Sequence, residues 1–306
     1  MFCFCVSTLN LKLFFVKLFF VQNFNQPPVE NFSEKQLQQI LADENPTPDN
    51  PPWNWLTASG VWLASIVFLV LPSILAVFYA AAKNIDVRNA ETLKEFLLND
   101  SSAILLQMIL VLPAHILTLA LAWAVVTKFN KFSFRKTLGW ELGGFKFWHS
   151  VVILVAFFLL AATLTALFGE QDNELMRILR SSRSAVYIVA FLATFTAPIV
   201  EEVVYRGIIY SAFYKAFGVG IAVIVASTLF SAVHFLQYNG DVTALIMICL
   251  LSLVLTLIRA RTGNLLPCIV LHTVFNGIQS LLLILQPYLN FGNTTEPHPA
   301  LFHLWK

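Results

Sequence analysis

Apolar residues in this chain occur in long, nearly uninterrupted blocks separated by short polar stretches. The blocks are about 20 residues long, which is the length that an α-helix needs to cross about 30 Å of hydrocarbon. The pattern therefore predicts an all-α, polytopic transmembrane bundle of about seven helices. The expected spans cover residues 60–82, 101–127, 147–168, 185–217, 219–237, 242–258 and 265–285.

The first 55 residues follow a different pattern. Residues 1–21 are apolar but interrupted by two lysines, and they would add an eighth span if they insert into the membrane. Residues 22–55 are polar and rich in Pro, Asn and Gln, which predicts an extramembrane linker with one short helix near residues 33–42. Trp53 and Trp55 are interpreted as interface anchors for the first span.

These patterns divide the chain into four parts. They are an N-terminal segment with its linker (1–55), N-terminal transmembrane helices (56–184), a C-terminal transmembrane core (185–288) and a tail (289–306).

Composition supports the membrane interpretation. Hydrophobic residues make up 58% of the chain and charged residues 12%, whereas soluble domains carry about 25% charged residues. The mean hydropathy is +0.74. A formal net charge of +2 without a long basic run argues against a nucleic-acid partner, and membrane lipids are the expected surroundings. The four cysteines do not form a disulfide framework.

Ionisable side chains inside the expected spans are concentrated in the last third of the chain. Each one costs about 2.5–3.5 kcal/mol at the centre of a membrane helix, so each needs a partner. Three separate spans carry such groups and can bury them only by turning them toward one another. The fourth span contributes Glu201, Glu202 and Arg206, the fifth contributes His234, and the seventh contributes His272 and Asn276.

Helical spacing distinguishes the two adjacent glutamates. Glu202 and Arg206 are four residues apart, so they can form an ion pair on one face of their helix. Glu201 has no basic residue three or four positions away, and its partner must come from another helix. Pro198 precedes the pair by about one turn and is expected to loosen the helix and free a backbone carbonyl.

A carboxylate, two imidazoles and a carboxamide in a dry pocket suit the hydrolysis of an amide. Glu201 can act as a general base toward water, aided by one histidine. The other histidine and Asn276 can donate hydrogen bonds to the oxyanion. Alternatively, Glu201, His234 and His272 could bind zinc, whose bound water would be the nucleophile. The sequence leaves zinc and a metal-free mechanism both open.

Three short motifs occur in order on successive apolar segments: Glu201-Glu202-x-x-x-Arg206, Phe230-x-x-x-His234 and His272-x-x-x-Asn276. Together they resemble the motifs of the CAAX protease and bacteriocin-processing (CPBP) family of intramembrane proteases. That family is similar to the type II CAAX prenyl endopeptidase of eukaryotes. The resemblance covers about residues 185–285.

The resemblance implies a membrane-embedded endopeptidase with a defined division of roles. Glu201 and His234 would activate water, while His272 and Asn276 would form the oxyanion site. Glu202 with Arg206 would support the pocket. The implied substrate is a peptide or protein segment near the membrane surface, either prenylated or bacteriocin-like. The protein would reside in the plasma (inner) membrane of a bacterium or the endoplasmic reticulum of a eukaryote.

Two other classes of protein could use the same residues. A proton-coupled transporter also places such groups inside helices, although no inverted repeat is visible. A non-enzymatic immunity or scaffold protein of the same fold would keep them as a buried salt-bridge cluster for helix packing. His115 and His149 have no motif around them and are interpreted as structural or interfacial.

Overall fold

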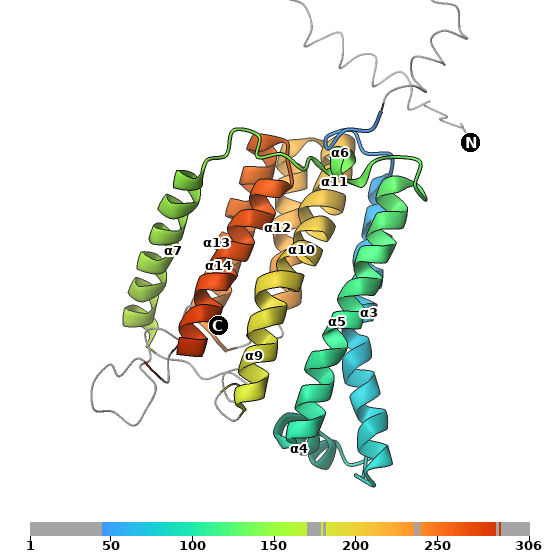
Figure 1. Ribbon diagram of the computed structural model, residues 1–306, viewed down its shortest axis with the longest axis vertical. Helices are drawn as coiled ribbons and strands as arrows, with labels where there is room; N and C mark the ends of the chain where they lie inside the picture. Colours follow the sequence, from blue (N-terminus) through green and yellow to red (C-terminus); the bar gives the residue numbers. More distant parts are fainter. Residues whose placement is uncertain are drawn as a thin grey trace, which may run out of the picture. The chain divides into compact units, whose positions relative to one another are not determined.

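The computed structural model describes residues 45–169, 179, 182–235, 238, 240–285 and 288 (Figure 1). The expected N-terminal span, the short helix near residues 33–42 and the C-terminal tail lie outside these residues. Residues 45–306 form one compact unit by themselves. Within its described part, the chain is helical and has no β-strand, which confirms the predicted all-α class.

Each of the seven expected spans corresponds to a helix or a helical run in the described residues. Six are long and apolar enough to cross a membrane, and α12 is a shorter apolar helix. Two short helices in the connections, α4 (Ala90–Asn99) and α6 (Phe134–Leu138), were not expected from the sequence. The long elements are α3 (Trp55–Ala82), α5 (Ser101–Thr127), α7 (Phe147–Phe168), the run Arg183–Phe217, α12 (Val219–Phe235), α13 (Val242–Thr262) and α14 (Leu266–Leu285).

The fourth span is a continuous helical run that mixes α-helical and π-helical hydrogen bonding. Two π-helical turns interrupt it, and such turns occur frequently at functional sites. Glu201 and Glu202 lie between the two π-helical turns. The successive segments are α9 (Arg183–Phe191), η1 (Leu192–Thr196), α10 (Ala197–Glu202), η2 (Val203–Ile209) and α11 (Tyr210–Phe217).

The arrangement of the other helices places the fourth span in contact with both halves of the chain. Helices α3 and α5 lie side by side, and α12 packs against α13 (Figure 1). Helix α14 packs along α9, η1 and α10, while α5 also contacts α10 and η1. The helix that carries both glutamates therefore contacts α5 and α14.

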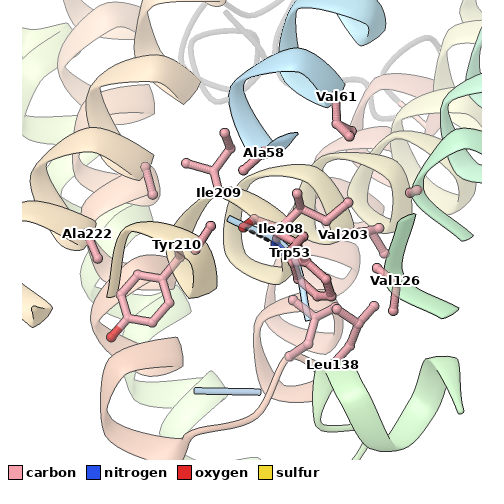
Figure 2. Close-up of a cluster of buried hydrophobic side chains, with 14 of the residues drawn as sticks. Trp53, Ala58, Val61, Val126, Leu138, Val203, Ile208, Ile209, Tyr210 and Ala222 are labelled. Atoms are coloured by element: carbon pink, nitrogen blue, oxygen red, sulfur yellow. Dashed lines mark hydrogen bonds between the residues drawn. The ribbon is translucent and has the colours of Figure 1, made fainter. Parts of the chain in front are cut away.

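A buried apolar cluster joins the start of α3 to the second half of the fourth span (Figure 2). Its labelled members come from α3, α5, α6, η2, α11 and α12, together with one residue that precedes α3. These residues are Trp53, Ala58, Val61, Val126, Leu138, Val203, Ile208, Ile209, Tyr210 and Ala222.

Trp53 corrects one interpretation made from the sequence. Its side chain is only 6% exposed, and its indole Nε1 donates a hydrogen bond to the backbone oxygen of Ile208 at 3.1 Å. The residue is therefore a core side chain and not an interface anchor, because the chain just before α3 packs into the bundle. Trp55, at the first position of α3, is 40% exposed.

Replacing Trp53 by Phe should weaken this attachment. The variant keeps an aromatic ring but removes the indole donor to the carbonyl of Ile208, which should lower the free energy of unfolding by about 1–3 kcal/mol. Equilibrium unfolding in mixed micelles would measure the change. The matched control is Trp55→Phe, and equal losses in the two variants would contradict this role for Trp53.

Helix α13 also differs from its expected bounds. It continues past residue 258 to Thr262. This last turn includes Arg259, whose side chain is almost completely buried. Arg259 Nη2 lies 2.9 Å from the backbone oxygen of Pro48 and 3.1 Å from the carboxylate of Asp49. The stretch 45–54, called here the N-terminal strap, thus supplies the countercharge that lets an arginine stay inside the bundle.

Candidate active site

An ion pair with no exposed side-chain surface lies in the fourth span. Glu202 and Arg206 have fully buried side chains, and Arg206 Nη1 donates to Glu202 Oε1 at 2.9 Å, as the four-residue spacing predicts. The Nδ1 atom of His272 lies 2.8 Å from the same carboxylate oxygen. One oxygen of Glu202 therefore holds side chains from two helices, α14 and its own.

The other donors of Arg206 bind α13. Its Nη2 atom donates to the backbone oxygen and the hydroxyl of Ser252 at 2.8 and 2.9 Å, and its Nε atom donates to Thr256 Oγ1 at 3.2 Å. The guanidinium also lies 4.6 Å from the centre of the Phe230 ring. The sequence interpretation missed Ser252 and Thr256. Their four-residue spacing is the signal that could have indicated a polar face on α13.

Glu201 has a different environment from its neighbour. Its side chain keeps 24% of its surface exposed, and its Oε2 atom lies 3.8 Å from His272 Nε2. This distance is too long for a hydrogen bond but short enough for an electrostatic contact. His272 therefore lies between a buried carboxylate on Nδ1 and a partly exposed one on Nε2.

Asn276 binds the first π-helical turn. Its amide nitrogen donates to the backbone oxygen of Ala193 at 2.9 Å. That oxygen is free because Ala197 donates its N–H to Leu192 in the π-helical pattern, and Pro198 has no N–H to offer. A proline that frees a carbonyl was expected from the sequence, and Asn276 is the residue that binds it.

His234 contacts the ring of Phe230, which in turn contacts Arg206 of the ion pair. Its Nδ1 atom lies 2.8 Å from the backbone oxygen of Phe230, and the two rings stack at 4.7 Å. The Phe230 ring in turn meets His272 edge-on at 6.0 Å. A carbonyl only accepts, so Nδ1 of His234 carries the hydrogen and Nε2 has a free lone pair in the neutral ring. In the described residues, no hydrogen bond or ion pair links His234 to Glu201.

Tyr238 is a further aromatic group at this end of α12, and the sequence interpretation gave it no role. Its ring stacks on that of His234 at 6.4 Å, with an interplanar angle of 13°. Burial raises the pKa of the Tyr238 hydroxyl, and the negative charges of Glu201 and Asp241 raise it further. Tyr238 therefore lies within the electrostatic reach of Glu201.

The zinc alternative requires Glu201, His234 and His272 to converge on one point. Over the described ranges, no group of three or more His, Cys, Asp or Glu side chains is arranged to hold a metal ion. The Nδ1 atoms of both histidines contact oxygen atoms at 2.8 Å, so only their Nε2 atoms would be left for a metal ion. In the described part of the chain, the arrangement of these three side chains does not fit a zinc site.

Residues 183–278 match the model of a protein family described as type II CAAX prenyl endopeptidase Rce1-like. The matched segment contains all three motifs, and this result confirms the family resemblance that they predict. No curated protein and no solved structure matches the chain significantly. The match and the long apolar helices agree on an integral, multi-pass membrane protein.

Proposed function

We propose that this chain, with its Rce1-like segment over residues 183–278, is an intramembrane endopeptidase. The observation that carries the proposal is the position of His272 between two unlike carboxylates. Buried Glu202 fixes Nδ1 of the ring at 2.8 Å, and Nε2 faces the partly exposed Glu201 at 3.8 Å. Two carboxylates in such different environments support two different roles.

Glu201 is the general base of the proposed reaction. It takes a proton from a water molecule, whose oxygen attacks the carbonyl carbon of the scissile peptide bond. The electron pair of the C=O bond moves onto oxygen and forms the oxyanion. When the C–N bond breaks, Glu201 returns the proton to the leaving amine. The free lone pair on Nε2 of His234 is suited to accept a hydrogen bond from the attacking water.

The oxyanion is stabilised from α14. Asn276 uses one amide hydrogen on the carbonyl of Ala193, and its second hydrogen is available for the substrate. His272 donates from Nε2 when its ring is protonated, and the carboxylate of Glu202 balances that charge while it fixes the ring. Glu202 is already bound to Arg206, so it holds the imidazole and does not act as the base.

The substrate is a peptide or protein segment that reaches the site from the membrane surface. A prenylated CAAX tail is the first candidate, since the matched family is described as a prenyl endopeptidase. A bacteriocin-like or other apolar peptide is the second. Glu201 keeps part of its surface exposed, which supports access of water and of a peptide to this carboxylate.

Peptide cleavage by the purified protein in detergent tests the proposal. The substrates are a farnesylated tail peptide, the same peptide without its lipid and a mixture of apolar peptides. His234→Ala should lower kcat by about 10²–10⁴, the range for loss of an acid–base group. The control is His149→Ala, because His149 is exposed at the start of α7 and contacts the backbone of Lys146.

Two further comparisons separate the alternatives. A chelator should leave the rate unchanged, whereas a loss that zinc restores would favour the metal mechanism. Folded wild-type protein that cleaves none of the peptides would contradict the proposal and favour an immunity or scaffold protein. Solute uptake into vesicles by a protein that cleaves no peptide would favour a transporter.

A further inference from the structure

His115 is a buried imidazole in the middle part of α5 that the proposed mechanism does not use. A polar ring inside a membrane-spanning helix is costly and is expected to have a partner. Its Nδ1 atom lies 2.9 Å from Thr196 Oγ1. This contact ties α5 to the fourth span at the last residue of η1.

The direction of this hydrogen bond follows from the neighbouring groups. Thr196 Oγ1 also lies 3.1 Å from the backbone oxygen of Leu192. A carbonyl only accepts, and a hydroxyl has one hydrogen, so Thr196 donates to Leu192 and accepts from Nδ1–H of His115. This assignment of the tautomer rests on the hydrogen-bond network. It leaves Nε2 of His115 with a lone pair, for which the described residues show no partner.

Thr196 lies at the junction of η1 and α10 in the fourth span. It is the cap of α10, the short helix that carries Glu201. The oxygen of Leu192, to which Thr196 donates, also accepts the N–H of Ala197 and thereby closes the π-helical turn. His115 therefore donates to the hydroxyl of Thr196, and that hydroxyl donates to the carbonyl of Leu192. The same carbonyl accepts the π-type hydrogen bond.

Helix α14 holds the same turn by two other contacts. Asn276 donates to the oxygen of Ala193, and Thr194 Oγ1 donates to Ser280 Oγ at 2.9 Å. A Cβ on Gly277 would come within 3.4 Å of the Thr194 side chain, so the two helices approach closely here. The η1 turn is thus bound by side chains from both α5 and α14.

Glu201 lies five residues after Thr196 in the same helical run. We propose that His115 is a positioning residue of the peptidase site, which fixes the η1 turn through Thr196 and thereby sets the direction of the Glu201 carboxylate. This inference rests on the proposed function. Because His115 lies outside the matched segment 183–278, the site depends on the N-terminal half of the chain as well.

Kinetics on the cleaved peptide test this role. His115→Ala should lower kcat roughly tenfold to a hundredfold with KM unchanged, the effect of a misplaced base on a bound substrate. His115→Asn can place its amide donor near the position of Nδ1 and should recover most of kcat. His115→Gln places its amide nearer the position of Nε2 and should not. His149→Ala, at an exposed histidine of α7, is the control.

Two results would overturn the inference. One is a wild-type kcat in His115→Ala. The other is an equal loss in the Asn and Gln variants, because rescue would then not follow the donor to Thr196. A variant that merely unfolds is recognised by its lowered melting temperature, and the comparison of Asn with Gln still applies at a temperature where both are folded.

A measurement that needs no activity separates this inference from the proposed function. Ring ¹⁵N signals of His115 should show the Nδ1-protonated tautomer in the wild type and should shift in Thr196→Val and in Glu201→Gln. Signals of His149 should stay unchanged. If the wild type cleaves no peptide, the proposed function fails, and unshifted His115 signals in both variants would overturn the inference by themselves.

Discussion

Glu201→Gln is expected to lower kcat for peptide hydrolysis by about 10²–10⁴. The substitution keeps the size and shape of the side chain but replaces one acceptor oxygen by an NH₂ group, so the side chain can no longer take a proton from water. The fold should tolerate it, since Glu201 is partly exposed and lies 3.8 Å from His272 Nε2 without a hydrogen bond to it. Initial rates on the best cleaved peptide would measure the loss.

The control for this experiment is a glutamate away from the site. Glu141 is exposed in the connection between α6 and α7, so Glu141→Gln should keep the wild-type rate and the wild-type melting temperature. A Glu201→Gln variant that cleaves as fast as Glu141→Gln would remove Glu201 from the mechanism. Cleavage that persists equally in all variants would instead indicate a contaminating protease.

Arg206→Met should strongly destabilise the fold. It removes the cation next to a fully buried carboxylate and leaves Glu202 with His272 as its remaining partner. Breaking a buried ion pair on one side costs about 3–5 kcal/mol, since an uncompensated charge stays inside the protein. Equilibrium unfolding in mixed micelles would give the change in the free energy of unfolding.

A double variant distinguishes loss of charge balance from loss of packing. Glu202→Gln combined with Arg206→Met removes both charges, and it should recover most of the stability that Arg206→Met loses. The exposed Arg88 provides the surface control, and Arg88→Met should change stability little. A double variant that is less stable than Arg206→Met would show that the Glu202 carboxylate still stabilises the fold through His272, and it would contradict the charge-balance explanation.

The long helices and the central ion pair could be predicted from the sequence. Apolar length alone marks a membrane span, and the four-residue spacing of Glu202 and Arg206 is a local property of one helix. The free carbonyl near Pro198 was predictable for the same reason, because a proline removes a backbone donor wherever it stands. These features depend on residues that are near one another in the chain.

The features that were missed depend on contacts between distant parts of the chain. Trp53 contacts Ile208 and Asp49 contacts Arg259, and both lie in the N-terminal strap, which has no periodic pattern. His115 had no motif around it, because Thr196, its partner, lies on another helix. The sequence around an isolated polar residue in an apolar segment does not show which other helix its side chain faces. Its partner can therefore be identified only in the folded chain.

The first π-helical turn works as a phase shift in the fourth span. Each hydrogen-bonded loop of a π-helical turn contains one residue more than a loop of an α-helix. The side chains that follow the turn are therefore rotated by about 100° relative to an uninterrupted helix. Deleting one residue from Leu192–Thr196 would cancel that shift. It would point Glu201 away from His272 although no residue of the three motifs had changed. The alignment of this site is therefore sensitive to chain length in η1 as well as to residue identity.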